Sequence, residues 1–113
     1  GTINYDTNTQ SVVYYTSAAV GDWTINFRAS SGATLNSVIA TGEAITLVHL
    51  VTLTGAEYRN TTVQVDGSSI TPEWQGGAAP TEGNINSIDS YTYTIIKTGD
   101  AAFTVLAALT QFA

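Results

Sequence analysis

The strict alternation of polar and apolar side chains in residues 22–28 is the pattern that most restricts the fold of this chain. Trp23, Ile25 and Phe27 share one face of an extended segment, whereas the residues between them are polar or charged. A repeat of two residues is typical of a β-strand that buries one face and exposes the other to water. The segment therefore predicts a strand packed on a hydrophobic core, with Trp23 inside that core.

Similar alternation predicts further strands. Residues 43–53 form the longest candidate, and the side chains on one face of it are Ile45, Leu47, His49, Val51 and Leu53. Its other face is also largely apolar, so we expect a central strand. Residues 11–16 predict another strand, and the loop at residues 17–21 predicts a hairpin that joins it to residues 22–28.

Turn residues predict two more hairpins. Asp66-Gly67 is the strongest short hairpin signal in the chain, and it separates residues 61–65 from residues 69–74. Pro72 places the second of these runs at a sheet edge or a bulge, because proline cannot donate to a ladder. Residues 88–98 and 101–109 predict a hairpin around Gly99-Asp100, preceded by a long loop at residues 75–87.

These elements predict one all-β domain that covers residues 1–113. A chain of 113 residues can bury a modest core, and it contains no internal repeat or linker. About seven short strands separated by turns predict a single β-sandwich with a jelly-roll-like or Ig-like path. The spacing of apolar residues at positions 34–39, followed by Gly42, predicts at most one short helical turn.

The charge of the chain limits its partners. The net charge is −6, and Arg28, Arg59 and Lys97 are the only basic residues. Binding to nucleic acid requires clustered basic residues, and so does binding to an anionic membrane, so neither partner is expected. The apolar stretch at residues 44–53 is too short to cross a membrane.

The sequence predicts a protein that is not an enzyme and that needs no cofactor or metal. The chain has no Cys, no calcium-loop pattern and no cluster of His and Cys for zinc. Its one histidine, His49, has no recognisable nucleophile as a partner. We interpret His49 as a packed, hydrogen-bonded core residue, or alternatively as a contact in a ligand or subunit surface. A small glycan-cleaving enzyme is a weaker alternative, which requires two carboxylates facing each other across a cleft.

Two aromatic residues beside loops are candidate contacts for a ligand or receptor. Tyr58 and Trp74 are suited to stack on sugar rings, although aromatic residues in β-rich chains more often fill the core. An exposed groove formed by both residues and the loop at 75–87 would favour a module that binds a host surface glycan.

Short motifs distributed over nearly the whole chain carry a resemblance to a known family. Those near the C-terminus are Trp74-Gln75-Gly76-Gly77, Ser87-Ile88-Asp89, Thr94-Ile95-Ile96-Lys97-Thr98 and Gln111-Phe112-Ala113. Those upstream are Thr2-Ile3-Asn4-Tyr5, residues 11–16, Thr34-Leu35-Asn36-Ser37, Ala40-Thr41-Gly42 and Val65-Asp66-Gly67-Ser68. The chain resembles β-rich structural domains in the virion proteins of marine tailed phages.

The resemblance implies a structural part of a virion, such as a fibre, tail, baseplate or decoration module. We expect a homo-oligomer, first of all a trimer because fibres are implied, or assembly with neighbouring virion proteins. The long strand at residues 43–53 and the C-terminal segment are apolar on both faces, and a two-layer sandwich covers only one. Candidate interface residues are Phe112, Leu109 and His49. The alternative is that the loop at 75–87 covers the second face as a third layer.

Overall fold

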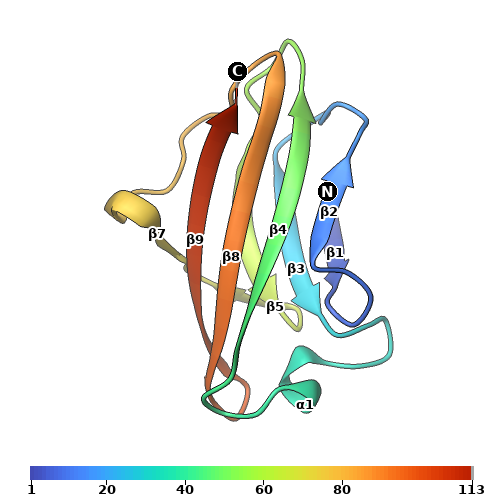
Figure 1. The fold of residues 1–113 in the computed structure, drawn as a ribbon, viewed down its shortest axis with the longest axis vertical. Coiled ribbons are helices and arrows are strands. Elements are labelled where there is room, and N and C mark those ends of the chain that lie inside the picture. The colour runs from blue at the N-terminus through green and yellow to red at the C-terminus, as the bar shows by residue number, and fades with distance from the viewer. Residues whose placement is uncertain (113) are drawn as a thin grey trace.

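The computed structural model describes residues 1–112 and confirms an all-β sandwich. Two sheets pack face to face in a body of about 41 × 30 × 19 Å (Figure 1). The strands of the first sheet are, in spatial order, β1 (Thr2–Asp6), β3 (Trp23–Arg28), β5 (Asn60–Val65) and β6 (Ser68–Ile70). Those of the second sheet are β2 (Val12–Tyr15), β4 (Ala44–Leu53), β8 (Ser87–Gly99), β9 (Ala102–Phe112) and β7 (Glu73–Trp74).

The first five strands alternate between the two sheets. As a result β1 pairs in parallel with β3, β3 with β5, and β2 with β4. The predicted hairpin between residues 11–16 and 22–28 is therefore wrong. The loop at 17–21 crosses from one sheet to the other instead of reversing within one, since the alternation pattern specifies which side of a strand is buried but not its neighbour.

The other two predicted hairpins are confirmed. β5 and β6 are antiparallel around Asp66 and Gly67, whose φ angles of 52° and 82° match the tight turn that favours this dipeptide. β8 and β9 form the longest antiparallel pair. Pro72 lies between β6 and β7, where the chain leaves one sheet for the other, and β6 is the edge strand that its position predicted.

The core contains the residues that alternation places inside. Trp23 is 5% exposed, and Ile25 and Phe27 beside it are fully buried. The predicted inward face of β4 is buried from Leu47 onward, and Tyr91, Tyr93 and Ile95 of β8 complete the opposite wall. Trp23 as a core residue is therefore confirmed.

A single turn of helix closes one end of the sandwich. The helix α1 (Leu35–Val38) confirms the predicted turn, and the hydroxyl group of Thr34 caps it. The Asp66 carboxylate accepts hydrogen bonds from the first two amide groups of α1. The buried ammonium of Lys97 donates to the carbonyl groups of Asn36 and Ile39 at its other end. A short 3-10 turn, η1 (Gln75–Gly77), was not predicted.

Asn60 is the polar centre of the core. It is 2% exposed, and its amide nitrogen donates to the carbonyl oxygens of Trp23 and Thr62. Its side-chain oxygen accepts the hydroxyl proton of Tyr93, and its backbone amide donates to the Tyr91 hydroxyl. These bonds join β3 and β5 of one sheet to β8 of the other, at the point where the β3–β5 register shifts.

We expect Tyr93→Phe to destabilise the fold by about 1–3 kcal/mol, because it leaves the buried side-chain oxygen of Asn60 without a donor. Tyr14→Phe is the matched control, since it removes the same hydroxyl group from a residue that is 49% exposed. Urea unfolding of both variants measures the difference. Equal stability of the two variants would contradict the role given to Asn60.

Candidate functional site

The outer face of the five-stranded sheet is formed mainly by the outward side chains of β2, β4, β8 and β9. Within residues 1–112, the outward positions of β2, β4, β8 and β9 carry no charged side chain. Pairing aligns these positions in rows across the strands, for example Val12 with Val48, Thr92 and Ala108. The face therefore consists of aliphatic and aromatic groups separated by Thr and Ser.

Several apolar side chains protrude from this outer face. Those that are exposed are Val12, Tyr14, Ile88, Leu106 and Phe112. A single acidic residue, Glu73 on the short edge strand β7, pairs with Leu106 at the border of the face. Figure 1 shows the loop at 75–87 beside the β9 edge of the sheet and not across its front. The alternative of a third layer made by this loop is therefore wrong.

The candidate interface residues occupy three different environments. Phe112 is 57% exposed and belongs to the outer face. Leu109 pairs with Tyr91 on the inner side of the sheet and packs against the core. His49 is fully buried inside the single chain. The prediction of His49 as a subunit contact is therefore wrong, because the inward face of β4 is covered by the other sheet.

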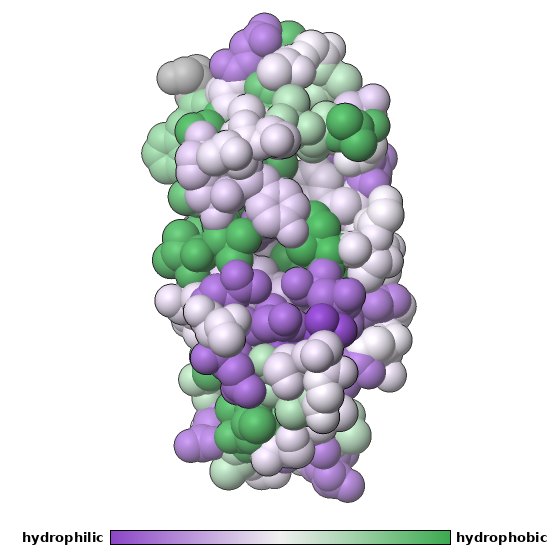
Figure 2. Space-filling view, turned by 90° about the vertical axis from the view of Figure 1, so that its right-hand side faces the viewer, coloured by the Kyte–Doolittle hydropathy of each residue, from purple (hydrophilic) through white to green (hydrophobic). Residues whose placement is uncertain are grey.

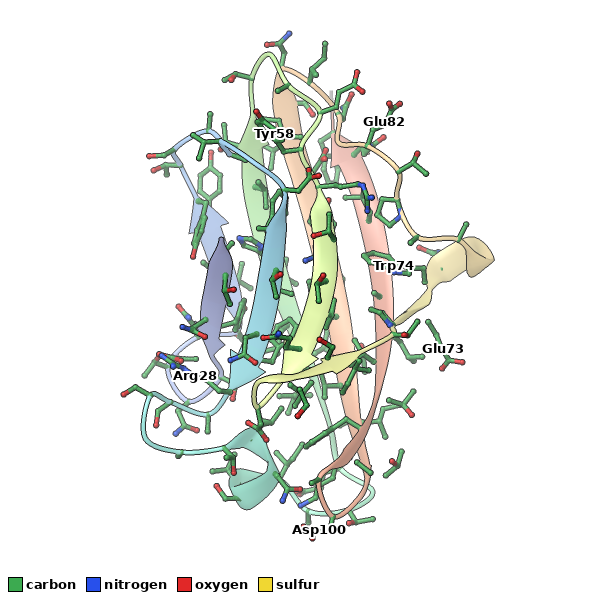
Figure 3. All side chains as sticks on the ribbon, turned by 180° about the vertical axis from the view of Figure 1, so that it is seen from behind. Arg28, Tyr58, Glu73, Trp74, Glu82 and Asp100 are labelled. Carbon is green, nitrogen blue, oxygen red and sulfur yellow. The ribbon has the colours of Figure 1, made fainter. Side chains whose placement is uncertain are left out.

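A groove of about 890 Å³ lies along the β7–β9 edge of the sandwich. Trp74, most of the loop at 75–85 and the end of β9 line it. Trp74 is half-buried, and its ring packs edge-on against Tyr91 and Tyr93. Tyr58 is also half-buried but does not line the groove, and Figure 3 shows it nearer to the end of the sandwich than Trp74. Trp74 and the loop therefore form one groove, as predicted, but Tyr58 is not part of it.

The loop is held in place by tight packing at Gly83. A Cβ atom at this position would overlap the carbonyl oxygen of Tyr58 and the side chain of Leu53. The neighbouring amide of Asn84 donates to the buried carboxylate of Asp89, and burial raises the pKa of that carboxyl group. The sequence did not indicate this contact, because Tyr58 and Leu53 precede Gly83 by 25 and 30 residues.

Two acidic residues meet at the groove. Glu57 and Glu82 lie near each other, and the interaction with Glu82 raises the pKa of Glu57. Both residues are exposed, and the groove also contains the polar side chains of Gln75, Asn84 and Gln111. Sequence reasoning missed this pair because 25 residues of chain separate its members.

His49 lies in an aromatic environment near the opposite edge. Its ring is 4.8 Å from that of Tyr15 and 6.0 Å from that of Trp23, measured between centroids, with both neighbours edge-on. Within residues 1–112 neither of its ring nitrogens has a hydrogen-bond partner. The expected packing of His49 is confirmed, whereas the expected hydrogen bonding is wrong. Burial lowers the pKa of His49 to about 4, so the ring is neutral at pH 7.

Comparisons with known proteins return no match to a protein-family model, to a curated protein or to a solved structure. Within the described residues, no three His, Cys, Asp or Glu side chains gather as a metal site requires. None of the helices in that part of the chain has the length and apolar character needed to cross a membrane.

His49 makes stability depend on pH in a defined direction. In the unfolded chain His49 binds a proton near its ordinary pKa of 6.5, but in the folded chain only near 4. The free energy of unfolding is therefore not reduced by His49 above pH 6.5. It falls as the pH drops towards 4, by up to about 3 kcal/mol. We expect His49→Phe to remove this loss. Urea unfolding at several pH values measures the free energy of unfolding of the parent and the variant. If this free energy falls with pH as steeply in the variant as in the parent, the lowered pKa of His49 is contradicted.

Proposed function

We propose that this protein is a non-enzymatic structural module of a tailed-phage virion, in a fibre, tail, baseplate or decoration subunit. It assembles with copies of itself or with neighbouring virion proteins. The resemblance of the chain to virion β-domains supports a place in a virion. The observation that supports assembly is the outer face of β2, β4, β8 and β9, which carries no charged side chain and whose exposed residues include Val12, Leu106 and Phe112.

The dimensions of this face fit a protein partner. Three long strands and the shorter β2, spaced ~4.8 Å apart and rising ~3.3 Å per residue, span roughly 600 Å² of flat sheet. Protruding side chains increase this area towards the ~800 Å² that each partner contributes to a typical stable interface. The exposed apolar side chains on this face are suited to burial in an interface, and the interspersed Thr and Ser hydroxyl groups keep the face hydrated before assembly.

The basic residues do not form a surface for an anionic partner. Arg28 is paired with Asp6 at 2.6 Å, and Lys97 is buried against backbone carbonyl groups. Arg59 is the remaining cation, on a chain whose net charge is −6. This distribution supports a protein partner over nucleic acid, which requires several clustered cations.

The carboxylate pair at the groove supports a non-enzymatic role. A glycoside hydrolase of the common type holds its two carboxyl groups ~5–9.5 Å apart, so that the sugar and water fit between them. Glu57 and Glu82 are instead both exposed on surface loops, so neither is held in a fixed position on either side of a bound sugar. The pair is better suited to accept hydrogen bonds than to cleave a glycosidic bond.

We expect the isolated chain to form a trimer, and Val12→Lys to shift it towards monomer, because Val12 is exposed on the outer face and pairs with Val48, so the added charge would lie in an apolar contact. Gln64→Lys adds the same charge to the outward side of β5 in the other sheet and is the matched control. Multi-angle light scattering measures the mass of each variant. A strictly monomeric chain at high concentration that also fails to join purified particles would contradict the proposal.

Recognition of a host glycan is the second candidate function, and the groove beside Trp74 is the observation that favours it. It offers one aromatic ring edge, the neutral polar side chains of Gln75 and Gln111, and the carboxylates of Glu57 and Glu82, which can accept hydrogen bonds from sugar hydroxyl groups. This role is compatible with a place in a fibre tip.

We expect Gln111→Ala to weaken glycan binding about tenfold or less, because it removes one hydrogen-bonding group from the groove while the core stays intact. Gln10→Ala, between β1 and β2, is the control that should bind like the parent. A glycan array followed by calorimetry tests both variants. Equal binding of a glycan by the parent and Gln111→Ala would show that the groove is not the site.

A further inference from the structure

A cavity of about 420 Å³ opens at the β1–β2 edge, where the two sheets separate. It is lined by the start of β1, by the loop at 17–22, and by residues of β2, β3 and β4. Figure 2 looks onto this edge and shows hydrophobic patches next to a hydrophilic band. Its volume lies within the ~300–1,000 Å³ of pockets that hold small molecules.

Two buried polar side chains at this cavity have no hydrogen-bond partner within residues 1–112. The indole Nε1 of Trp23 is one, and the two ring nitrogens of His49 are the others. Trp23 is 5% exposed and His49 is fully buried, and both contribute to the cavity lining. Each buried polar group without a partner costs about 1–3 kcal/mol, so a molecule that satisfied them would regain part of that energy.

The donors and acceptors of these groups define the chemistry of a ligand. The indole Nε1–H of Trp23 is a donor only. His49 is neutral at pH 7 and therefore offers one N–H donor and one acceptor nitrogen. A hydroxyl group both accepts and donates, so one such group can satisfy Trp23 and the acceptor of His49. A carbonyl group would leave the acceptor nitrogen unpaired.

The remaining walls determine the body of the ligand. Ile3, Ala18, Ala19, Val20 and Val51 give the cavity a mainly apolar lining. The one charged side chain in the lining is Asp22, whose carboxylate accepts a hydrogen bond from the Arg59 amide. The negative charge of Asp22 disfavours an anionic ligand. A water molecule can satisfy the unpaired nitrogens, but it leaves the apolar walls in contact with solvent, whereas a ligand with an apolar body also covers those walls.

Access to the unpaired nitrogens requires one side chain to move. Tyr15 packs edge-on against His49 and is 40% exposed, on the edge strand β2. Since its ring has solvent on one side, rotation of the side chain costs little packing and uncovers His49 from the cavity. Tyr15 is therefore the residue whose rotation would admit a ligand to His49.

From this geometry we propose that the cavity at the β1–β2 edge binds a small, uncharged organic molecule that has an apolar body and one hydroxyl group. The hydroxyl group contacts Trp23 and His49, and the body lies against the loop at 17–22. The site is separate from the outer face and from the groove at Trp74, so it does not depend on the proposed virion role.

Three ring compounds of the same size test the chemistry of the site. Phenol carries the hydroxyl group, toluene lacks a polar atom, and benzoate is an anion. Nuclear magnetic resonance follows the two indole N–H signals, which Trp74→Phe assigns. We expect phenol to shift the Trp23 signal in a saturable way with a Kd of about 1–10 mM, about tenfold tighter than toluene, and benzoate to have no effect. The Trp74 signal is the internal control.

Variants then test the contacts. His49→Phe should reduce the preference for phenol over toluene, and Tyr15→Ala should strengthen phenol binding by removing the ring that packs against His49. If His49→Phe does not fold, the ring ¹⁵N shifts of the single histidine in the parent report the contact instead. A Trp23 signal that moves no more than that of Trp74, equal binding of phenol and toluene, or a bound water that phenol does not displace would each overturn the proposal.

Discussion

The buried amide of Asn60 is the contact on which the arrangement of the two sheets depends. Its bonds reach Trp23 and Thr62 in one sheet and Tyr93 in the other, so a shift of either sheet breaks at least one of them. A fully satisfied polar group in a core specifies one packing arrangement, because every alternative leaves a costly unpaired atom. The apolar contacts around Asn60 supply stability, whereas the amide fixes their register.

A row of aromatic rings extends from this centre to both edges of the sandwich. Trp74, Tyr91, Trp23, His49 and Tyr15 follow one another at centroid distances of 4.8–6.3 Å, each edge-on to the next. The two ends of the row lie at the groove and at the cavity, so one continuous packing arrangement forms a wall of each. The outer face of the five-stranded sheet lies on the opposite side of the strands that carry Tyr91 and His49.

The sequence predicted which side of a strand is buried better than it predicted which strands pair with one another. The period of two placed Trp23, Ile25 and Phe27 inside because that choice depends only on local hydrophobicity. It did not predict that β2 and β3 lie in different sheets, because a loop such as residues 17–21 serves both connections. Of the candidate sites, Trp74 and the adjacent loop could be predicted from their types and order. Asn60 and the Glu57–Glu82 pair could not, because their partners are distant in sequence.

The buried polar groups divide by position into two kinds. Asn60 and Lys97 have their hydrogen bonds satisfied, and they lie where strands or α1 must be fixed. Trp23, His49 and Asp89 keep unpaired atoms. Trp23 and His49 border the cavity, and Asp89 is one hydrogen bond from the groove through Asn84. A domain whose free energy of unfolding is ~5–15 kcal/mol can retain only a few unpaired buried atoms. Because these atoms lie beside the groove and the cavity, the two concave regions are the surfaces suited to ligands, and the fully hydrogen-bonded core supports them.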